Sequence, residues 1–191
     1  MKYERIERAT FLERPNRFIA YARIAGKQET IHVKNTGRCA ELLVPEAEIF
    51  VQESDNPERK TKWDLIGVRK GNRLINMDSQ IPNKVVEEWL RAGNLFLEPV
   101  TVRPETTYGN SRFDFYVESG EKKAFIEVKG VTLEEDGVVR FPDAPSERAV
   151  KHMEELIRDK KGRIRCLCIS GDPDERRPLF YTEYGYTAGI W

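Results

Sequence analysis

The sequence predicts an α+β (α/β) protein in which a small β-barrel is followed by a compact α/β unit. Short apolar runs broken by turn residues fill the first 80 residues, which is typical of a small barrel. Apolar residues then take a helical spacing at positions 85, 86, 89 and 90, and strands and a second helix follow. We therefore predict two domains, residues 1–80 and 81–191.

Strands dominate the predicted barrel. Residues 29–33 alternate between apolar and polar, as a half-buried strand does, whereas 53–62 are polar and contain a proline, which indicates a loop. Residues 35–38 have turn character. The strands are expected at 11–15, 17–24, 29–33, 47–52 and 63–69.

The second domain is expected to run helix, three strands, helix. The first helix covers 82–92 and stops at Gly93, and the last covers 146–160 with Ser146 as its N-cap. The strands between them are expected around 97–102, 113–118 and 123–129.

Charge and composition exclude several classes of protein. The 32 basic and 32 acidic residues cancel, so any contact with nucleic acid must come from a local basic patch. No apolar run reaches the roughly 20 residues that span a bilayer, and the charged N-terminus lacks the apolar core of a secretory signal. Three cysteines without a CxxC pair fit neither a disulfide framework nor a zinc site. We expect a cytoplasmic protein with no membrane partner.

The most informative stretch is a predicted hairpin over residues 112–129. Gly120 and Glu121 fit a two-residue type II′ turn, which has glycine at its first central position. The turn pairs Phe115 with Ile126 and places the apolar residues 113, 115, 117, 124, 126 and 128 on one face. A register slip of one residue would mix the two faces, so this consistency supports the pairing.

The same register places Asp114 opposite Glu127 on the other face, with Lys129 beside Glu127 and Arg112 opposite Lys129. Opposed carboxylates repel, and a divalent cation would remove the conflict. The alternative is an ordinary solvated face on which Arg112, Lys123 and Lys129 screen the two acids.

Asp114 followed by Glu127-Val-Lys129 resembles the PD-(D/E)xK nuclease pattern, with Phe113 in place of the proline. The resemblance implies that Asp114 and Glu127 bind Mg²⁺ or Mn²⁺ and that Lys129 assists a water molecule. It also implies a third acidic ligand from the preceding helix, either Glu87 or Glu88, of which we favour Glu87.

Longer segments resemble the sugar fermentation stimulation (SfsA) family over residues 10–161. They are Asn35–Leu43, Ser111–Phe115, Glu127–Leu133 and Phe141–Arg148 with Lys151 and His152. The resemblance implies an OB-fold-like N-terminal domain, a nuclease-like C-terminal domain and DNA binding, with a regulatory link to sugar (maltose) metabolism.

OB barrels bind nucleic acid through basic grooves with stacking aromatic rings. Phe18 and Tyr21 could stack on bases, or at least one of them could belong to the core. Residues 35–38 could present Arg38 to a phosphate or could form a plain turn. We predict DNA contacts by Arg17, Lys34, Arg38, Arg112, Arg148 and Lys151.

The resemblance ends near Arg163, and the tail over 163–191 is atypical. Suitable synonymous codons for this tail, read one base later, encode a sequence like the family's continuation. We therefore expect a frameshift near Lys161 and Gly162 and an incomplete C-terminal part. The alternative is divergence, with Cys166–Ile169 still forming the expected strand.

Three functions are compatible with these observations. The first is a DNA-binding protein with a metal-dependent phosphodiesterase site, and the second is a non-catalytic DNA-binding regulator of sugar metabolism genes. The third is a sugar-responsive interaction protein that does not need DNA. Intact Asp114, Glu127 and Lys129 favour the first, and the lack of a helix-turn-helix signature argues against a sequence-specific repressor.

Overall fold

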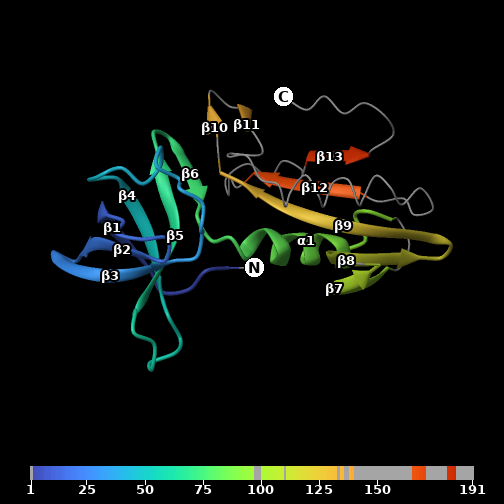
Figure 1. Cartoon of the computed structure of the whole chain (residues 1–191), viewed down its shortest axis with the longest axis horizontal. Coiled ribbons are helices and arrows are strands. Elements are labelled where there is room, and N and C mark those ends of the chain that lie inside the picture. Colours follow the sequence, from blue (N-terminus) through green and yellow to red (C-terminus); the bar gives the residue numbers. More distant parts are fainter. Residues whose placement is uncertain are drawn as a thin grey trace. The chain divides into compact units, whose positions relative to one another are not determined.

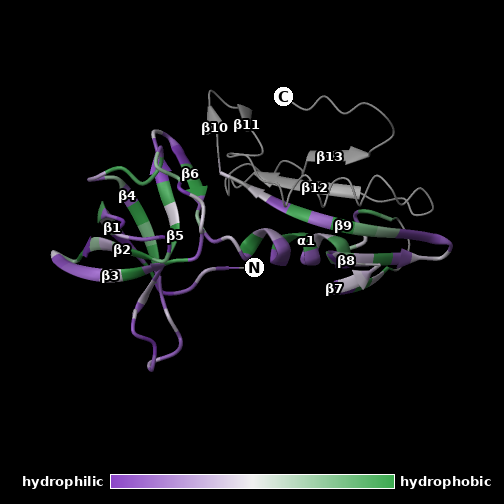
Figure 2. Cartoon of the chain, viewed as in Figure 1, coloured by the Kyte–Doolittle hydropathy of each residue, from purple (hydrophilic) through white to green (hydrophobic). Residues whose placement is uncertain are grey.

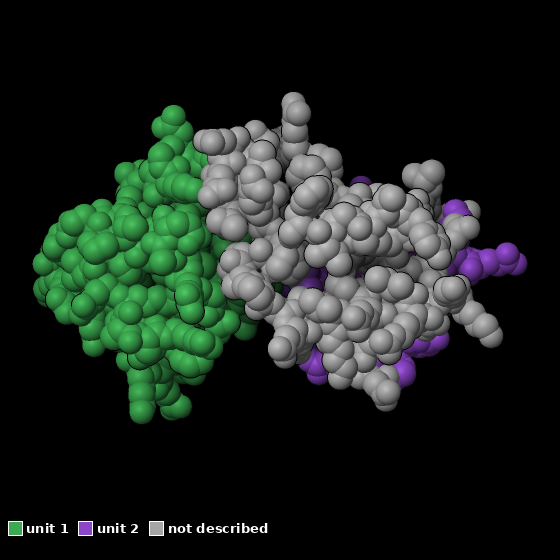
Figure 3. Space-filling view, turned by 45° about the horizontal axis from the view of Figure 1, so that its top comes forward, with its two compact units in different colours: residues 1–81, 132–139, 171–177 green, residues 82–131, 140–170, 178–191 purple. Residues whose placement is uncertain are grey.

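The computed structural model describes residues 2–96, 100–109 and 111–132, and the backbone of four further strands. The chain divides into two compact units (Figure 3). The first unit comprises residues 1–81, 132–139 and 171–177, and the second comprises 82–131, 140–170 and 178–191.

The first unit contains a six-stranded sheet that closes on itself. The strands are β1 (Ile6–Glu13), β2 (Ile19–Ile24), β3 (Lys27–Val33), β4 (Glu48–Glu53), β5 (Trp63–Lys70) and β6 (Arg73–Asn76). Their order is β3-β2-β1-β4-β5-β6, and β3 also pairs with β5 in parallel (Figure 1). This closure confirms the predicted OB-like barrel. The additional strand β6 follows β5 through the tight turn at Gly71.

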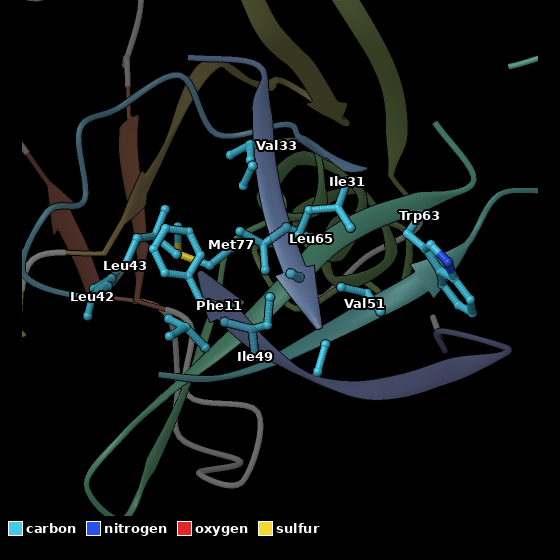
Figure 4. Close-up of a cluster of buried hydrophobic side chains, with 14 of the residues drawn as sticks. Phe11, Ile31, Val33, Leu42, Leu43, Ile49, Val51, Trp63, Leu65 and Met77 are labelled. Atoms are coloured by element: carbon cyan, nitrogen blue, oxygen red, sulfur yellow. The ribbon is translucent and has the colours of Figure 1, made fainter. Parts of the chain in front are cut away.

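The barrel core consists of side chains from alternate strand positions. Ile31, Ile49, Val51 and Leu65 are all fully buried, and Figure 4 shows them converging with Met77 inside the barrel. The connection between β4 and β5 is mostly hydrophilic, in keeping with the predicted loop (Figure 2).

The second unit is built on a sheet of order β13-β12-β9-β8-β7. Its strands are β7 (Thr101–Tyr108), β8 (Ser111–Ser119), β9 (Lys122–Val131), β12 (Arg165–Ser170) and β13 (Phe180–Glu183). Strands β7, β8 and β9 form an antiparallel meander, and β12 is parallel to β9. A separate short pair, which belongs to the first unit, joins β10 (Glu134–Glu135) to β11 (Val138–Val139).

The helix α1 (Ile81–Arg91) runs alongside β8 and β9 (Figure 1). It buries Val86 and Leu90 against Phe115 and Ile126, as its spacing predicts. Asp78 accepts the backbone N–H of Gln80 just before the helix.

Strand β7 differs from the predicted strand at 97–102, because it begins at Thr101 and continues through Pro104. Proline cannot donate to a ladder and is tolerated mainly at a sheet edge, and β7 is the last strand in the sheet order.

The predicted helix at 146–160 lies outside the described residues. Cys166–Ile169 falls within β12, so this part of the tail forms a strand. No helix among the described residues is long and apolar enough to cross a membrane.

Candidate metal centre on the β8–β9 hairpin

The predicted hairpin register is confirmed from Phe115 to the turn, whereas the predicted pairs of Phe113 with Val128 and of Asp114 with Glu127 are not part of the ladder. Phe115 pairs with Ile126 and Val117 with Ala124. Gly120 has φ +57°, as the first central position of a type II′ turn requires. Local turn geometry therefore determines which residues of β8 and β9 meet.

Asp114 lies outside the regular pairing on both sides of β8, since the β8–β9 ladder extends only from Phe115 to Ser119. The β7–β8 ladder is interrupted between Pro104↔Phe115 and Thr106↔Phe113, and Glu105 has φ +51°. Asp114 Oδ2 instead accepts the backbone N–H of Val128 at 2.6 Å. The Asp114 carboxylate thus takes a donor from β9 itself.

Phe113 departs from the expected arrangement at this interruption. Phe113 is buried, and the centroid of its ring lies 5.2 Å from that of Phe125. Phe125 stands between Ala124 and Ile126, whose side chains belong to the core face. Because side chains alternate along a strand, Phe113 packs with a ring of the other face.

The structure brings Asp114, Glu127 and Lys129 together. Glu127 is only 6% exposed, and Lys129 Nζ donates to its Oε1. Burial raises the pKa of Asp114, and the charge of Glu127 raises it further. The bonds from Val128 and Asn83 and the charge of Lys129 act in the opposite direction without cancelling the rise.

The donor set of this acid pair fits a hard divalent cation. Mg²⁺ and Mn²⁺ favour carboxylate oxygens, and Mg²⁺ commonly binds through one or two carboxylates while it keeps several waters. Asp114 and Glu127 would hold such a cation.

Glu87 does not join the acid pair. Its carboxylate accepts two hydrogen bonds from Arg91, at 3.0 and 2.7 Å, one turn further along α1. No group of three or more His, Cys, Asp or Glu side chains able to hold a metal occurs among the described residues. The α1 residue that reaches the site is Asn83, whose Nδ2 donates to Asp114 Oδ1 at 2.9 Å. The nuclease pattern implies an acidic residue on this helix, so the sequence did not point to Asn83, an amide one turn before Glu87.

Arg112 is exposed and bonds to Glu105 at 3.3 Å rather than pointing at the acid pair. Arg148 and Lys151 lie outside the described residues. On the hairpin, the basic residue beside the acids is therefore Lys129.

Lys34, one of the predicted DNA contacts, is engaged by two acidic side chains of the barrel unit. Its ammonium lies 2.7 Å from Asp78 and 3.6 Å from Asp64, and its side chain is only 18% exposed. Both aspartates are buried and need counter-charges, so Lys34 is used within the barrel.

Arg17 and Arg38 are both exposed, and the half-buried side chain of Arg14 joins the loops that carry them. The guanidinium of Arg14 donates to five backbone carbonyls, at distances of 2.7 to 3.2 Å. These carbonyls belong to Asn16, Arg17, Asn35, Gly37 and Arg38. A guanidinium has five N–H donors, so Arg14 uses its full capacity to hold two loops together.

Phe18, the aromatic residue next to Arg17, is not a core residue. Phe18 is 56% exposed and Tyr21 is half-buried, so the core alternative is wrong for Phe18. An exposed ring beside Arg17 suits stacking on a base.

An OB-type barrel followed by a sheet domain with this acid pair defines a two-domain class of protein. A family model described as the SfsA N-terminal OB domain matches residues 12–77, and one described as the sugar fermentation stimulation protein RE domain matches residues 80–170. The chain belongs to the sugar fermentation stimulation (SfsA) family.

Curated relatives agree with this assignment. A sugar fermentation stimulation protein homolog of Clostridium beijerinckii is 63% identical over 157 residues, covering 82% of this chain and 70% of the relative. One from Desulfitobacterium hafniense is 64% identical over 156 residues, covering 82% and 68%.

A solved structure shares the fold. The SfsA of Pyrococcus furiosus, solved in complex with Ca²⁺, matches with a TM-score of 0.74 and covers 96% of each chain. At 24% sequence identity, this likeness supports the two-domain fold.

Proposed function

We propose that this chain is a DNA-binding protein with a divalent-cation-dependent phosphodiesterase site on the β8–β9 hairpin. The observation that carries the proposal is the pairing of Asp114 with the buried Glu127 beside Lys129. Two acids and one base leave a formal charge of −1 in a partly buried place, and a bound cation would offset this charge.

The site residues have distinct roles in this proposal. Asp114 and Glu127 supply the oxygen ligands for Mg²⁺ or Mn²⁺, and the Ca²⁺ complex of the Pyrococcus furiosus relative is consistent with such a site. A bound cation of this kind polarises a phosphoryl oxygen and makes its bound water more acidic.

Lys129 holds Glu127 through one donor. An ammonium has three donors, so the same group can bond a phosphate oxygen at the same time. Its charge also opposes the negative charge that develops on the phosphate during hydrolysis.

DNA contact is proposed for the loops that Arg14 holds together. Arg17 and Arg38 supply cationic groups suited to phosphate oxygens, and Phe18 supplies an exposed ring. The bonds of Arg14 order these loops before any ligand binds, which lowers the entropy lost on binding.

The second candidate is a non-catalytic DNA-binding regulator of sugar metabolism genes. The observation that favours it is that the loops held by Arg14 lie in the barrel unit, whereas the acid pair lies in the other unit. DNA binding by these loops would therefore not depend on the acid pair.

The experiment is incubation of single- and double-stranded DNA with the protein in Mg²⁺ or Mn²⁺. The Asp114→Asn variant removes one ligand charge, and Glu118→Gln on the same strand is the matched control, because Glu118 pairs with Lys123 instead. Cleavage by the parent and the control but not by Asp114→Asn supports the phosphodiesterase. DNA binding without cleavage by the parent contradicts it and favours the regulator.

A further inference from the structure

We infer that Asn83 is the residue of α1 that completes the metal site, as a positioning residue that orients Asp114. This inference rests on the proposed metal-dependent function. It replaces an acidic ligand from the helix with a neutral amide that acts through Asp114.

Asp114 is held by donors from two different elements. Asn83 Nδ2 in α1 donates to Oδ1 at 2.9 Å, and the backbone N–H of Val128 in β9 donates to Oδ2 at 2.6 Å. One donor on each oxygen fixes the rotation of the carboxylate plane. Each oxygen has two lone pairs, so each keeps one for a further partner.

The start of α1 is itself fixed against β9. A Cβ added at Gly130 would lie 3.0 Å from Pro82 Cγ, so the chain just before Asn83 contacts β9 immediately after Lys129. A side chain at residue 130 would require Pro82 to shift by a few tenths of an ångström, so glycine favours this close approach. The contact sets the distance from which Asn83 reaches Asp114.

Charge explains why an amide is suited to this position. The helix acid nearest in sequence, Glu87, is neutralised by Arg91, which also contacts the Val102 carbonyl at 3.4 Å. Asp114 and Glu127 already repel each other, and a third carboxylate at residue 83 would add to that repulsion in the metal-free protein. Asn83 provides a hydrogen-bond donor without a charge.

Mn²⁺ alone is the probe, measured by calorimetric titration and by the rise in melting temperature that it causes. We compare the parent with Asn83→Ala, Asn83→Asp and Asn94→Ala. Asn94 is the matched control, because its amide donates to the Trp89 carbonyl at 2.9 Å and not to the site.

Asn83→Ala is expected to weaken Mn²⁺ affinity about tenfold to a hundredfold, the usual effect of losing a group that orients a ligand. Asn83→Asp is expected to melt at a lower temperature without metal and to gain more from Mn²⁺ than the parent does. Asn94→Ala is expected to bind Mn²⁺ like the parent.

Parental Mn²⁺ affinity in both Asn83 variants, even with lowered melting temperatures, would show a purely structural role and overturn this inference alone. Absence of Mn²⁺ binding by the parent would overturn the proposed function and this inference with it.

Discussion

Burial decides which charged side chains are available to a ligand. Lys34 and Arg17 are both basic residues of the barrel that the sequence predicts as DNA contacts. In the structure, Lys34 neutralises two buried aspartates, whereas Arg17 is exposed. Burying a carboxylate without a counter-charge costs free energy, so a nearby cationic side chain pairs with it in the folded protein. That side chain is then less available to a ligand.

Asp64 provides a test of this principle. It is buried and accepts bonds from Arg59, at 2.8 and 3.0 Å, and lies 3.0 Å from His32 Nδ1. Burial raises the pKa of Asp64, but the bonds from Arg59 and His32 and the charge of Lys34 outweigh burial and lower it overall. A lowered folded pKa contributes stability above the unfolded value of about 3.9, and that stability is lost as the pH falls through the folded pKa.

Asp64→Asn is therefore expected to lower the free energy of unfolding at pH 7 by about 2–3 kcal/mol. The difference from the parent should shrink as the pH falls below about 4. Urea unfolding across this pH range measures it. Asp55→Asn is the control, because the Asp55 side chain is 89% exposed. A difference that does not change with pH would contradict the ionic role of Asp64.

Arg14→Lys tests the ordering of the two loops. Lysine keeps the charge but has three donors in place of five, so some of the five carbonyl bonds must be lost. We expect a loss of about 2 kcal/mol in stability and weaker binding of a labelled single-stranded oligonucleotide in fluorescence anisotropy. Arg8→Lys, whose parent side chain is 78% exposed, is the control. Unchanged DNA affinity in Arg14→Lys would separate the loops from DNA binding.

At the scale of elements, two-residue turns determine the strand register of hairpins in both units. Ala25 and Gly26 join β2 to β3 with φ +48° and +81°, the pattern of a type I′ turn. Alanine tolerates a positive φ poorly, whereas asparagine adopts it readily.

Ala25→Asn is expected to raise the free energy of unfolding by about 0.5–1 kcal/mol. Gly26→Ala is the control and is expected to lower the free energy of unfolding. A Cβ at residue 26 meets nothing within 4 Å, so the expected destabilisation comes from the positive φ alone. Thermal or urea unfolding measures both. A stabilising Gly26→Ala would show that the turn changes conformation.

At the scale of the whole molecule, the formal charge of zero means that DNA affinity depends on a few local cations. Each phosphate contact adds about one unit to the slope of log affinity against log salt. Arg17→Gln and Arg38→Gln are each expected to reduce that slope by about one unit, relative to the parent.

The control for the salt series is Lys27→Gln. Lys27 is exposed and pairs with Ile24, whereas Arg17 precedes Ile19 at the opposite end of the β2–β3 pairing. An equal change of slope in Lys27→Gln would point to diffuse attraction by the whole surface and not to the loops ordered by Arg14.

The sequence alone was sufficient for the barrel, the first helix and the hairpin register. These features depend on local physics: the Gly120 turn, the alternation along β8 and β9 and the spacing of Val86 and Leu90. Neighbours along the chain determine the helix and the hairpin register, whereas the barrel closes through the pairing of β3 with β5, which are distant in the sequence.

Contacts between distant residues were decided only by the tertiary structure. The sequence could not show that Lys34 is enclosed by Asp64 and Asp78, or that Asn83, rather than Glu87, bonds to Asp114. The reason is physical: burial and hydrogen-bond choice depend on which groups meet in space, and the partners here lie 30, 44 and 31 residues apart.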